Sequence, residues 1–188
     1  MIALIEAFDT RAPGLVLELG SGISSLFFAA RCSSLMKRGI TPPRIVSVEH
    51  SLEWLHIAEK RLRSHELDRY VHFVNAPIVP LESAEGSVMC YAPAPIFEAI
   101  QGRNVDLLLI DGPPGFNLTD PGRAGTLYAV EALLNDGCLV VVDDTHRCGE
   151  RLAIREWKQT FGKRIRRMRG WLTLDTQVEF EWHGVPGR

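Results

Sequence analysis

Short apolar runs alternate with longer amphipathic segments along most of the chain. The apolar runs, rich in Val, Leu and Ile, are Leu15–Leu19, Arg44–Val48, Val105–Ile110, Cys138–Val142 and the weaker Val71–Val74. Such runs are typical of strands buried on both faces of a parallel sheet. The amphipathic segments, with apolar residues at three- and four-residue steps, are Ser24–Met36, Leu52–Ser64, Ala124–Leu134 and Glu150–Phe161. This spacing predicts helices, and strands that alternate with helices predict a parallel α/β sheet in one domain spanning residues 1–188.

Two other regions have a different pattern. Trp171–Leu174 and Gln177–Trp182 alternate like the strands of an antiparallel hairpin. The basic segment Lys163–Arg169 before them is explained by a solvated helix end that leads into a strand, although contact with RNA or an anionic surface is the other interpretation. Pro77–Pro95 holds several prolines and small residues, so we expect a loop that borders a pocket.

The composition favours a small partner. With 46% hydrophobic residues among 188, the chain is long enough to bury a substantial core. Its 21 basic and 23 acidic residues are mixed along the sequence, so we expect no nucleic-acid partner. Four scattered cysteines without a CxxC pair indicate reduced thiols, and no leader precedes them, which makes the cytoplasm the expected compartment. The sequence has no apolar stretch of about 20 residues, so we expect no membrane partner.

The first strand ends in a glycine-rich turn. In open parallel sheets ligands bind outside the carboxyl ends of the strands. Here the strand ends with Glu18, followed by Gly20 and Gly22. The two glycines have no side chains, so the backbone can approach a ligand closely. Ser21 and Ser24 belong to the same turn. The spacing GxGxxS lacks the third glycine of the dinucleotide fingerprint, and an acid inside the strand suits a cationic ligand.

The next two strand ends are polar as well. Glu49 follows Ile-Val-Ser-Val, so its carboxylate is placed to accept both hydroxyls of a ribose, against the alternative of a solvated charge. His50 is interpreted as a helix-start or cofactor-edge residue. Asn75 and Ala76 follow the third strand, where an adenine would lie, although Asn75 is equally typical of a turn.

The sequence resembles a class I S-adenosylmethionine (SAM)-dependent methyltransferase, closest to methyltransferase family 24. Four motifs in order carry the resemblance, which runs from about Pro13 to the C-terminal hairpin: LVLELGSGIS, IVSVEH, VDLLLIDGPPG and GCLVVVDDTHR. The resemblance implies a Rossmann-like, seven-stranded, mostly parallel sheet, with helices on both faces and the last strand inserted antiparallel. It also implies that Glu18 and the glycines hold the methionine part of SAM, Glu49 the ribose and Asn75 with its neighbours the adenine.

Asp111 ends one strand and Asp143 with Asp144 ends the next, so three carboxylates converge at one edge of the sheet. Like charges at close range either raise each other's pKa or hold a cation between them, and oxygen ligands favour Mg²⁺, Ca²⁺ or Mn²⁺. The arrangement resembles catechol-type and sugar O-methyltransferases, in which these acids hold a divalent metal. The chain departs from that pattern, because Pro114 stands where the family has a lysine base and Asp144 where it has Asn. The alternative for Asp143 and Asp144 is N-terminal capping of the helix that starts near Glu150.

A general base and acceptor contacts complete the expected site, with Asp111, His146 and Asp143 as catalytic candidates. His146 suits proton removal near neutrality, against a capping or surface role. The rigid turn Asp111–Gly115 is expected to wall the acceptor pocket. Tyr91, Arg123 and Arg147 are candidates for contacts to the acceptor, each against ordinary surface pairing.

The sequence therefore predicts a SAM-dependent O-methyltransferase of a small hydroxylated acceptor, a sugar or a phenol, assisted by Mg²⁺. The alternatives are a metal-independent methyltransferase and a SAM-binding module without catalysis; a dinucleotide-dependent oxidoreductase is less consistent with the turn. Because little sequence precedes the first strand to cover a substrate, we also expect a homodimer whose second subunit supplies part of the lid.

Overall fold

The computed structural model describes residues 2–83, 86–115, 122–170 and 176–184. In this part of the chain a seven-stranded sheet has the order β3-β2-β1-β6-β7-β9-β8. Its strands are β1 (Leu15–Leu19), β2 (Arg44–Glu49), β3 (Val71–Asn75), β6 (Val105–Ile110), β7 (Leu134–Val142), β8 (Ile165–Arg169) and β9 (Val178–Trp182). The first five are parallel, and β9 runs antiparallel between β7 and β8. The predicted Rossmann-like fold with one inserted antiparallel strand is therefore confirmed.

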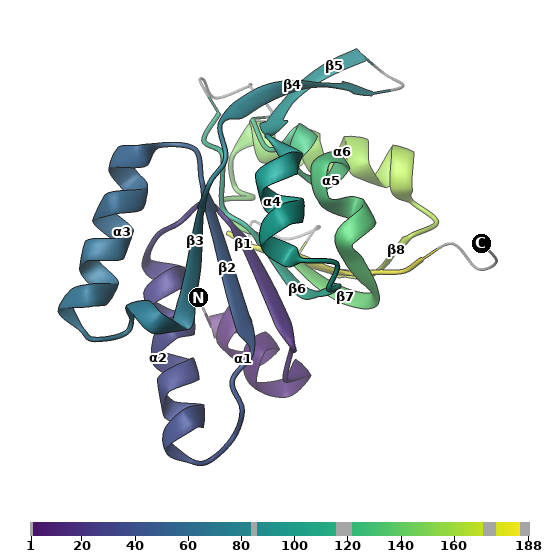
Figure 1. The fold of residues 1–188 in the computed structure, drawn as a ribbon. Coiled ribbons are helices and arrows are strands. Elements are labelled where there is room, and N and C mark those ends of the chain that lie inside the picture. The colour runs from purple at the N-terminus through teal and green to yellow at the C-terminus, as the bar shows by residue number, and fades with distance from the viewer. Residues whose placement is uncertain (1, 84–85, 116–121, 171–175, 185–188) are drawn as a thin grey trace.

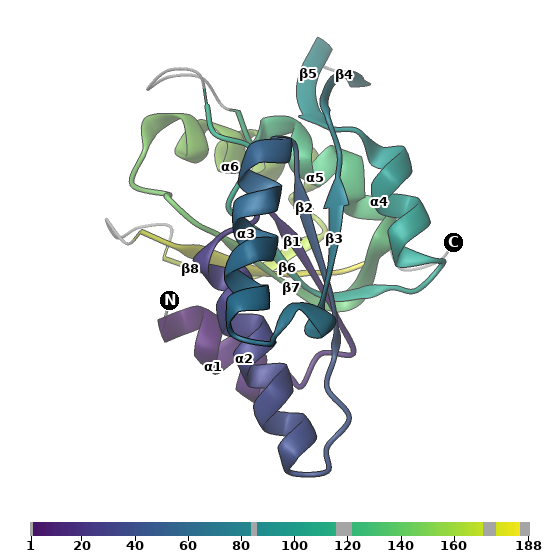
Figure 2. The same ribbon diagram turned by 60° about the vertical axis from the view of Figure 1, so that its left-hand side comes forward.

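Helices cover both faces of the sheet (Figures 1 and 2). Helices α1 (Ile2–Arg11), α2 (Ile23–Lys37) and α3 (Leu52–Ser64) lie on one face, and α4 (Pro93–Ile100), α5 (Ala124–Val130) and α6 (Cys148–Phe161) lie on the other. Short 3₁₀ turns occupy Asp68–Tyr70 and Glu131–Leu133. Two apolar cores result, one on each side of the central strands, and β1 is buried along its whole length. No helix in the described ranges is long and apolar enough to cross a membrane.

The sequence did not predict α1. Leu4 and Phe8 of this helix are buried, and the ring of Phe8 lies 5.6 Å from that of Phe28 on α2, measured between centroids. The apolar residues of 2–8 form a short run without a clear helical period, and only the packing of Phe8 against α2 shows which face is buried.

The prediction of a loop at Pro77–Pro95 is wrong. This region forms a two-stranded antiparallel ribbon of β4 (Ile78–Ser83) and β5 (Gly86–Tyr91), followed by the start of α4. Pro80 is tolerated because each strand of a two-stranded ribbon has a free edge, where a missing N–H breaks no ladder bond. Pro93 and Pro95 lie in the first turn of α4, where proline fits the helix.

Two further boundaries differ from the sequence prediction. The helix expected over Ala124–Leu134 ends as an α-helix at Val130, and β7 begins at Leu134, ahead of the expected Cys138. The basic segment Lys163–Arg169 is mostly β8 itself, which pairs with β9. Charged side chains suit β8 because it is an edge strand that must not pair further. The expected hairpin arm Trp171–Leu174 lies outside the described residues.

Candidate active site

The turn after β1 is closed at one glycine and open at the other. Gly20 has φ of +100°, and a Cβ on it would lie 2.8 Å from the backbone of Asp111 and Gly112. Glycine is therefore required here because the chain leaving β6 passes directly over the turn. A Cβ on Gly22 would meet nothing within 4 Å. Gly22 is also the N-cap of α2 and offers no side-chain acceptor to the first amides of this helix. The turn thus presents open space and helix N–H groups on one side.

Glu18 lies fully buried beneath this turn. The hydroxyls of Ser25 on α2 and Ser47 on β2 both donate to its Oε2. Burial raises the pKa of Glu18, while the hydroxyls of Ser24, Ser25 and Ser47 act in the opposite direction. The carboxylate thereby joins β1, β2 and α2 at the point where the turn begins. A cationic ligand above it would lower the cost of its charge.

Glu49 ends β2 and is only 6% exposed. Its carboxylate accepts hydrogen bonds from the backbone N–H groups of Ser21 at 3.3 Å and Ser51 at 2.9 Å. The Nδ1 atom of His50 lies 2.8 Å from its Oε1. The structure therefore places Glu49 beside the first turn, as the ribose prediction requires, with its orientation fixed by Ser21 and Ser51.

Asn75 ties the ends of β2 and β3 together. Its side-chain amide donates to the backbone oxygens of Glu49 at 3.0 Å and His50 at 3.1 Å. The buried Ala76 donates its N–H to the same Glu49 carbonyl at 3.0 Å. These bonds tie Asn75 to the end of the neighbouring strand, 26 and 25 positions away in the sequence, and bring it beside His50.

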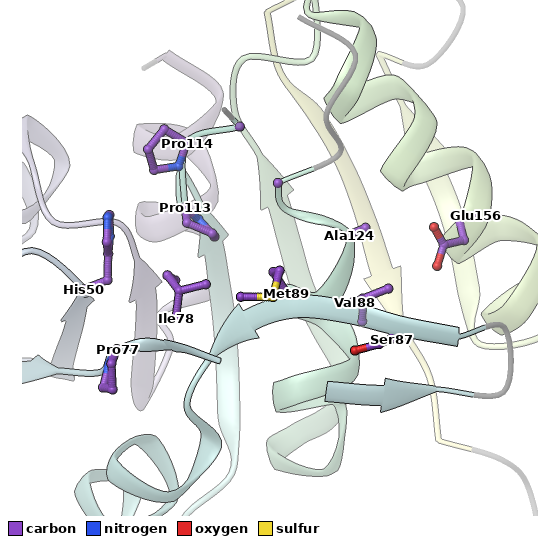
Figure 3. Close-up of a pocket in the computed structure, with 12 residues that line it drawn as sticks. His50, Pro77, Ile78, Ser87, Val88, Met89, Pro113, Pro114, Ala124 and Glu156 are labelled. Carbon is purple, nitrogen blue, oxygen red and sulfur yellow. The ribbon is translucent and has the colours of Figure 1, made fainter. Parts of the chain in front are cut away.

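A cavity of about 530 Å³ opens next to these strand ends (Figure 3). His50 and Pro77 stand at one end of it and Glu156 of α6 at the other. Between them the ribbon β4–β5 contributes Ile78, Ser87, Val88 and Met89, and the facing wall consists of Pro113, Pro114, Gly115, Gly122 and Ala124. The prediction that Pro77–Pro95 borders a pocket is confirmed, and most of the lining is apolar.

The carboxyl ends of β6 and β7 surround a buried guanidinium. Arg123 is 2% exposed and precedes α5. Its Nη1 donates to the backbone oxygen of Asp143, and its Nη2 donates to the backbone oxygen of Asp111 at 2.9 Å. Nη2 also lies 3.1 Å from Oδ2 of Asp144 and 3.4 Å from Oδ1 of Asp111. The predicted convergence of the acids is therefore present, with an arginine in its middle.

The Asp111 carboxyl has a raised pKa. Burial raises its pKa to about 7, the charges of Asp143, Asp144 and Glu18 add to the rise, and Arg123 opposes it. A third of the Asp111 side chain remains exposed. A carboxyl that titrates near neutrality and touches solvent can exchange a proton with a ligand.

The acids do not fit the divalent metal that the sequence suggested. Within the described ranges no three His, Cys, Asp or Glu side chains are arranged to hold a metal ion. The guanidinium lies against two of the three expected ligands, and a permanently charged cation there repels a dication. The reaction proposed for this site is therefore derived without Mg²⁺.

The other candidates are spread around this centre. Asp143 and Asp144 do not cap α6, because that helix begins at Cys148 with Arg147 as its N-cap. Asp143 instead accepts the N–H of Asp144 at 2.9 Å, and Asp144 has φ of +58°. His146 is exposed, and the 44% exposed Arg147 pairs with Oδ2 of Asp144 at 2.9 Å.

Tyr91 and Arg123 are not surface residues. Tyr91 is 1% exposed, and burial raises the pKa of its hydroxyl. A Cβ on Gly112 would lie 2.4 Å from this hydroxyl, so the residue packs under the Asp111–Gly115 turn. Surface pairing, the alternative interpretation for both residues, is therefore wrong.

The chain matches a known family over most of this site. The model of family 24, described as a methyltransferase domain, matches residues 17–145. The chain belongs to this methyltransferase family. A search of curated protein sequences gives no match.

Solved structures show the same fold as the methyltransferase. An O-methyltransferase from Bacillus cereus in complex with S-adenosylhomocysteine (SAH) has a TM-score of 0.60 at 14% identity, over 96% of this chain and 79% of that one. The O-methyltransferase TomG from Streptomyces achromogenes, involved in tomaymycin synthesis and in complex with SAM, has a TM-score of 0.57 at 15% identity, over 96% and 77%. The SAH-bound methyltransferase PaMTH1 of Podospora anserina has a TM-score of 0.59 at 16% identity, over 96% and 76%.

Sequence reasoning missed three polar residues of the methyltransferase site. Ser25 and Ser47 bind the Glu18 carboxylate, and Glu150 of α6 lies 3.8 Å from Nε of Arg123. Ser47 carried a signal, because it is a lone polar residue inside the apolar run Ile45–Val48. Ser25 directly follows the turn residue Ser24 and was overlooked, whereas Glu150 carried no signal because its partner Arg123 is 27 positions away.

Proposed function

We propose that the methyltransferase transfers the methyl group of SAM to a hydroxyl of a small acceptor, a sugar or a phenol. The observation that carries the proposal is that the open turn at Gly22, the carboxylates Glu18 and Glu49, and the acid Asp111 meet at one edge of the sheet. Neighbours titled as O-methyltransferases, with SAM or SAH bound, support it.

The residues present fit SAM. The N-terminus of α2, which has no side-chain cap hydrogen bond, would bind the carboxylate of the methionine part at the open side of the turn. Glu49 would accept the ribose hydroxyls, since its two backbone donors leave acceptor capacity on the carboxylate. The apolar end of the cavity at His50, Pro77 and Ile78, next to Asn75 and Ala76, suits a flat purine.

When bound, SAM supplies an electrophilic methyl group on a sulfonium. The protein's part is to orient the acceptor and to take the proton of its hydroxyl. Asp111 is the base we favour, because its pKa of about 7 and its partial exposure suit proton removal at neutral pH. Asp143 directly follows β7 and donates its N–H to the carbonyl of Ile110, the residue before Asp111, and His146 and Arg147 lie on the exposed turn beyond.

Calorimetric titration with SAH tests the cofactor half of the proposal. Replacing Glu49 by Gln removes a charge-assisted acceptor worth about 1.5–3 kcal/mol, so SAH should bind roughly 10- to 100-fold more weakly. The control is Glu53→Gln, an exposed acid in the first turn of α3, which should leave SAH affinity unchanged. NADH should not compete.

An acceptor screen with SAM labelled on its methyl group tests the reaction itself. We expect labelled product with hydroxylated sugars or phenols. Tight SAH binding together with silence across both acceptor classes would contradict O-methylation and favour a SAM-binding module without catalysis. Absence of SAH binding to the wild type would overturn the whole proposal.

A further inference from the structure

Arg123 joins four elements around the candidate site. It precedes α5, and its guanidinium contacts the chain ends after β6 and β7 and the Glu150 carboxylate of α6. Glu150 is itself buried, at 3% exposure. The guanidinium thus has three carboxylates and two backbone oxygens around it.

The position of this guanidinium is fixed by the backbone. Two of its nitrogens donate to the main-chain oxygens of Asp111 and Asp143, which cannot rotate away as side chains do. The preceding residue is held as well, because a Cβ on Gly122 would lie 2.7 Å from Gly115. Moving Arg123 out of the acid cluster would therefore break its hydrogen bonds to the ends of both strands.

The surrounding charges require a cation here. Asp111, Asp144 and Glu150 lie within 4 Å of the guanidinium, and Asp143 offers it a carbonyl. Carboxylates crowded at low exposure are costly unless a positive charge compensates them. Arginine supplies a permanent charge with planar donors that match carboxylates and carbonyls.

We propose that Arg123 is a resident cation that takes the place of a divalent metal among the acids at the ends of β6 and β7, so that the site works without metal. Arg123 is a positioning residue, because it fixes Asp111 and Asp144 and acts on the reaction only through the Asp111 carboxyl. That the reaction proceeds without metal rests on the proposed function, whereas the exclusion of a metal ion from these acids by Arg123 does not.

Thermal unfolding of the full-length protein with and without Mn²⁺ tests the metal statement. Mn²⁺ should leave the midpoint of the wild type unchanged. In Arg123→Met the acids lose their cation, so the midpoint should fall by about 10 °C, and Mn²⁺ should restore part of the loss. Arg123→Gln, which keeps an uncharged amide donor at this position, provides the same comparison if the Met variant does not fold.

Arg147→Met is the matched control. Arg147 binds the same Asp144 oxygen but is 44% exposed, so its loss should move the midpoint by no more than about 2 °C and should create no response to Mn²⁺. A charge-keeping Arg123→Lys variant should stay insensitive to Mn²⁺.

Three results would overturn the proposal. These are binding of Mn²⁺ to the wild type that Asp143→Asn abolishes, an Arg123→Met protein as stable as the wild type, or neutral Arg123 variants that gain no response to Mn²⁺. Because SAH binding is measured in the same samples, loss of the proposed function appears separately, as wild type that binds no SAH.

Discussion

At the scale of single residues, Asp111 couples the site to pH. In the folded protein its carboxyl keeps its proton up to about pH 7, whereas in the unfolded chain it ionises near its ordinary pKa of 3.8. Between these values the folded state holds more protons, so rising pH lowers the contribution of Asp111 to stability, and the loss is complete above about pH 7.

Asp111→Asn removes this dependence. Relative to the wild type, the variant should gain free energy of unfolding between pH 4 and pH 8, by roughly 1–2 kcal/mol, since partial exposure screens the group. Urea denaturation at the two pH values measures the change. An equal difference between the two proteins at both values would contradict it. As the base, Asp111 must be ionised, so kcat/KM of the wild type should rise with pH through about 7.

The sequence singled out candidate site residues where the signal was local. Glu18 and Glu49 were found because an acid at the end of an apolar run is conspicuous, and the structure places both beside the same turn. Arg123 was a candidate for acceptor contact or surface pairing, and its burial was missed because it depends on strand ends that lie 12 and 20 positions away. No local pattern reports such distant partners.

At the scale of elements, the ribbon β4–β5 is fixed to α5 by a glycine. A Cβ on Gly125 would lie 2.4 Å from the backbone oxygen of Met89 and 2.9 Å from Cβ of Cys90. This close approach lets the ribbon form one wall of the cavity, since Val88 and Met89 on it and Ala124 beside Gly125 line the same space.

Gly125→Ala should therefore push the ribbon away from α5. We expect a loss of about 1–3 kcal/mol in the free energy of unfolding, the usual cost of overpacking, measured by urea denaturation. Gly184→Ala is the control, because a Cβ there meets nothing closer than 4.0 Å and should change stability by less than about 0.5 kcal/mol. Equal effects of the two substitutions would show that the contact does not hold the ribbon.

The sequence missed the ribbon β4–β5 and helix α1, each for its own reason. The prolines in 77–95 suggested a loop, yet they occupy a ribbon strand and the first turn of α4, where their missing N–H groups do no harm. Helix α1 has a weak pattern and depends on packing against Phe28. The buried parallel strands were predicted because burial on both faces leaves a continuous apolar run.

At the scale of the whole molecule, the four cysteines differ in accessibility, because three lie in the two apolar cores and one does not. Cys32, Cys90 and Cys138 are buried, with exposures of 0%, 0% and 1%, and Cys148 at the start of α6 is exposed. Burial raises the pKa of the Cys32 thiol to about 11 and also raises those of Cys90 and Cys138. These three thiols are both shielded and un-ionised at neutral pH.

A thiol reagent such as 5,5′-dithiobis(2-nitrobenzoate) should therefore label Cys148 quickly in the native methyltransferase, and the other three only after unfolding in urea. Cys148→Ser should abolish the fast phase, which absorbance measures directly. Rapid labelling of more than one thiol under native conditions would mean that a core opens far more readily than this packing allows.

The bonds beneath the first turn have a consequence for how a ligand is captured. Glu18, Ser25 and Ser47 already join two strands and a helix, and Ser21 and Ser51 already orient Glu49. A pocket ordered in advance loses little conformational entropy when it is filled, so each contact with the ligand contributes more of its strength to affinity. Association then requires no ordering of this turn, and its rate is set by diffusion and by the orientation of the incoming molecule.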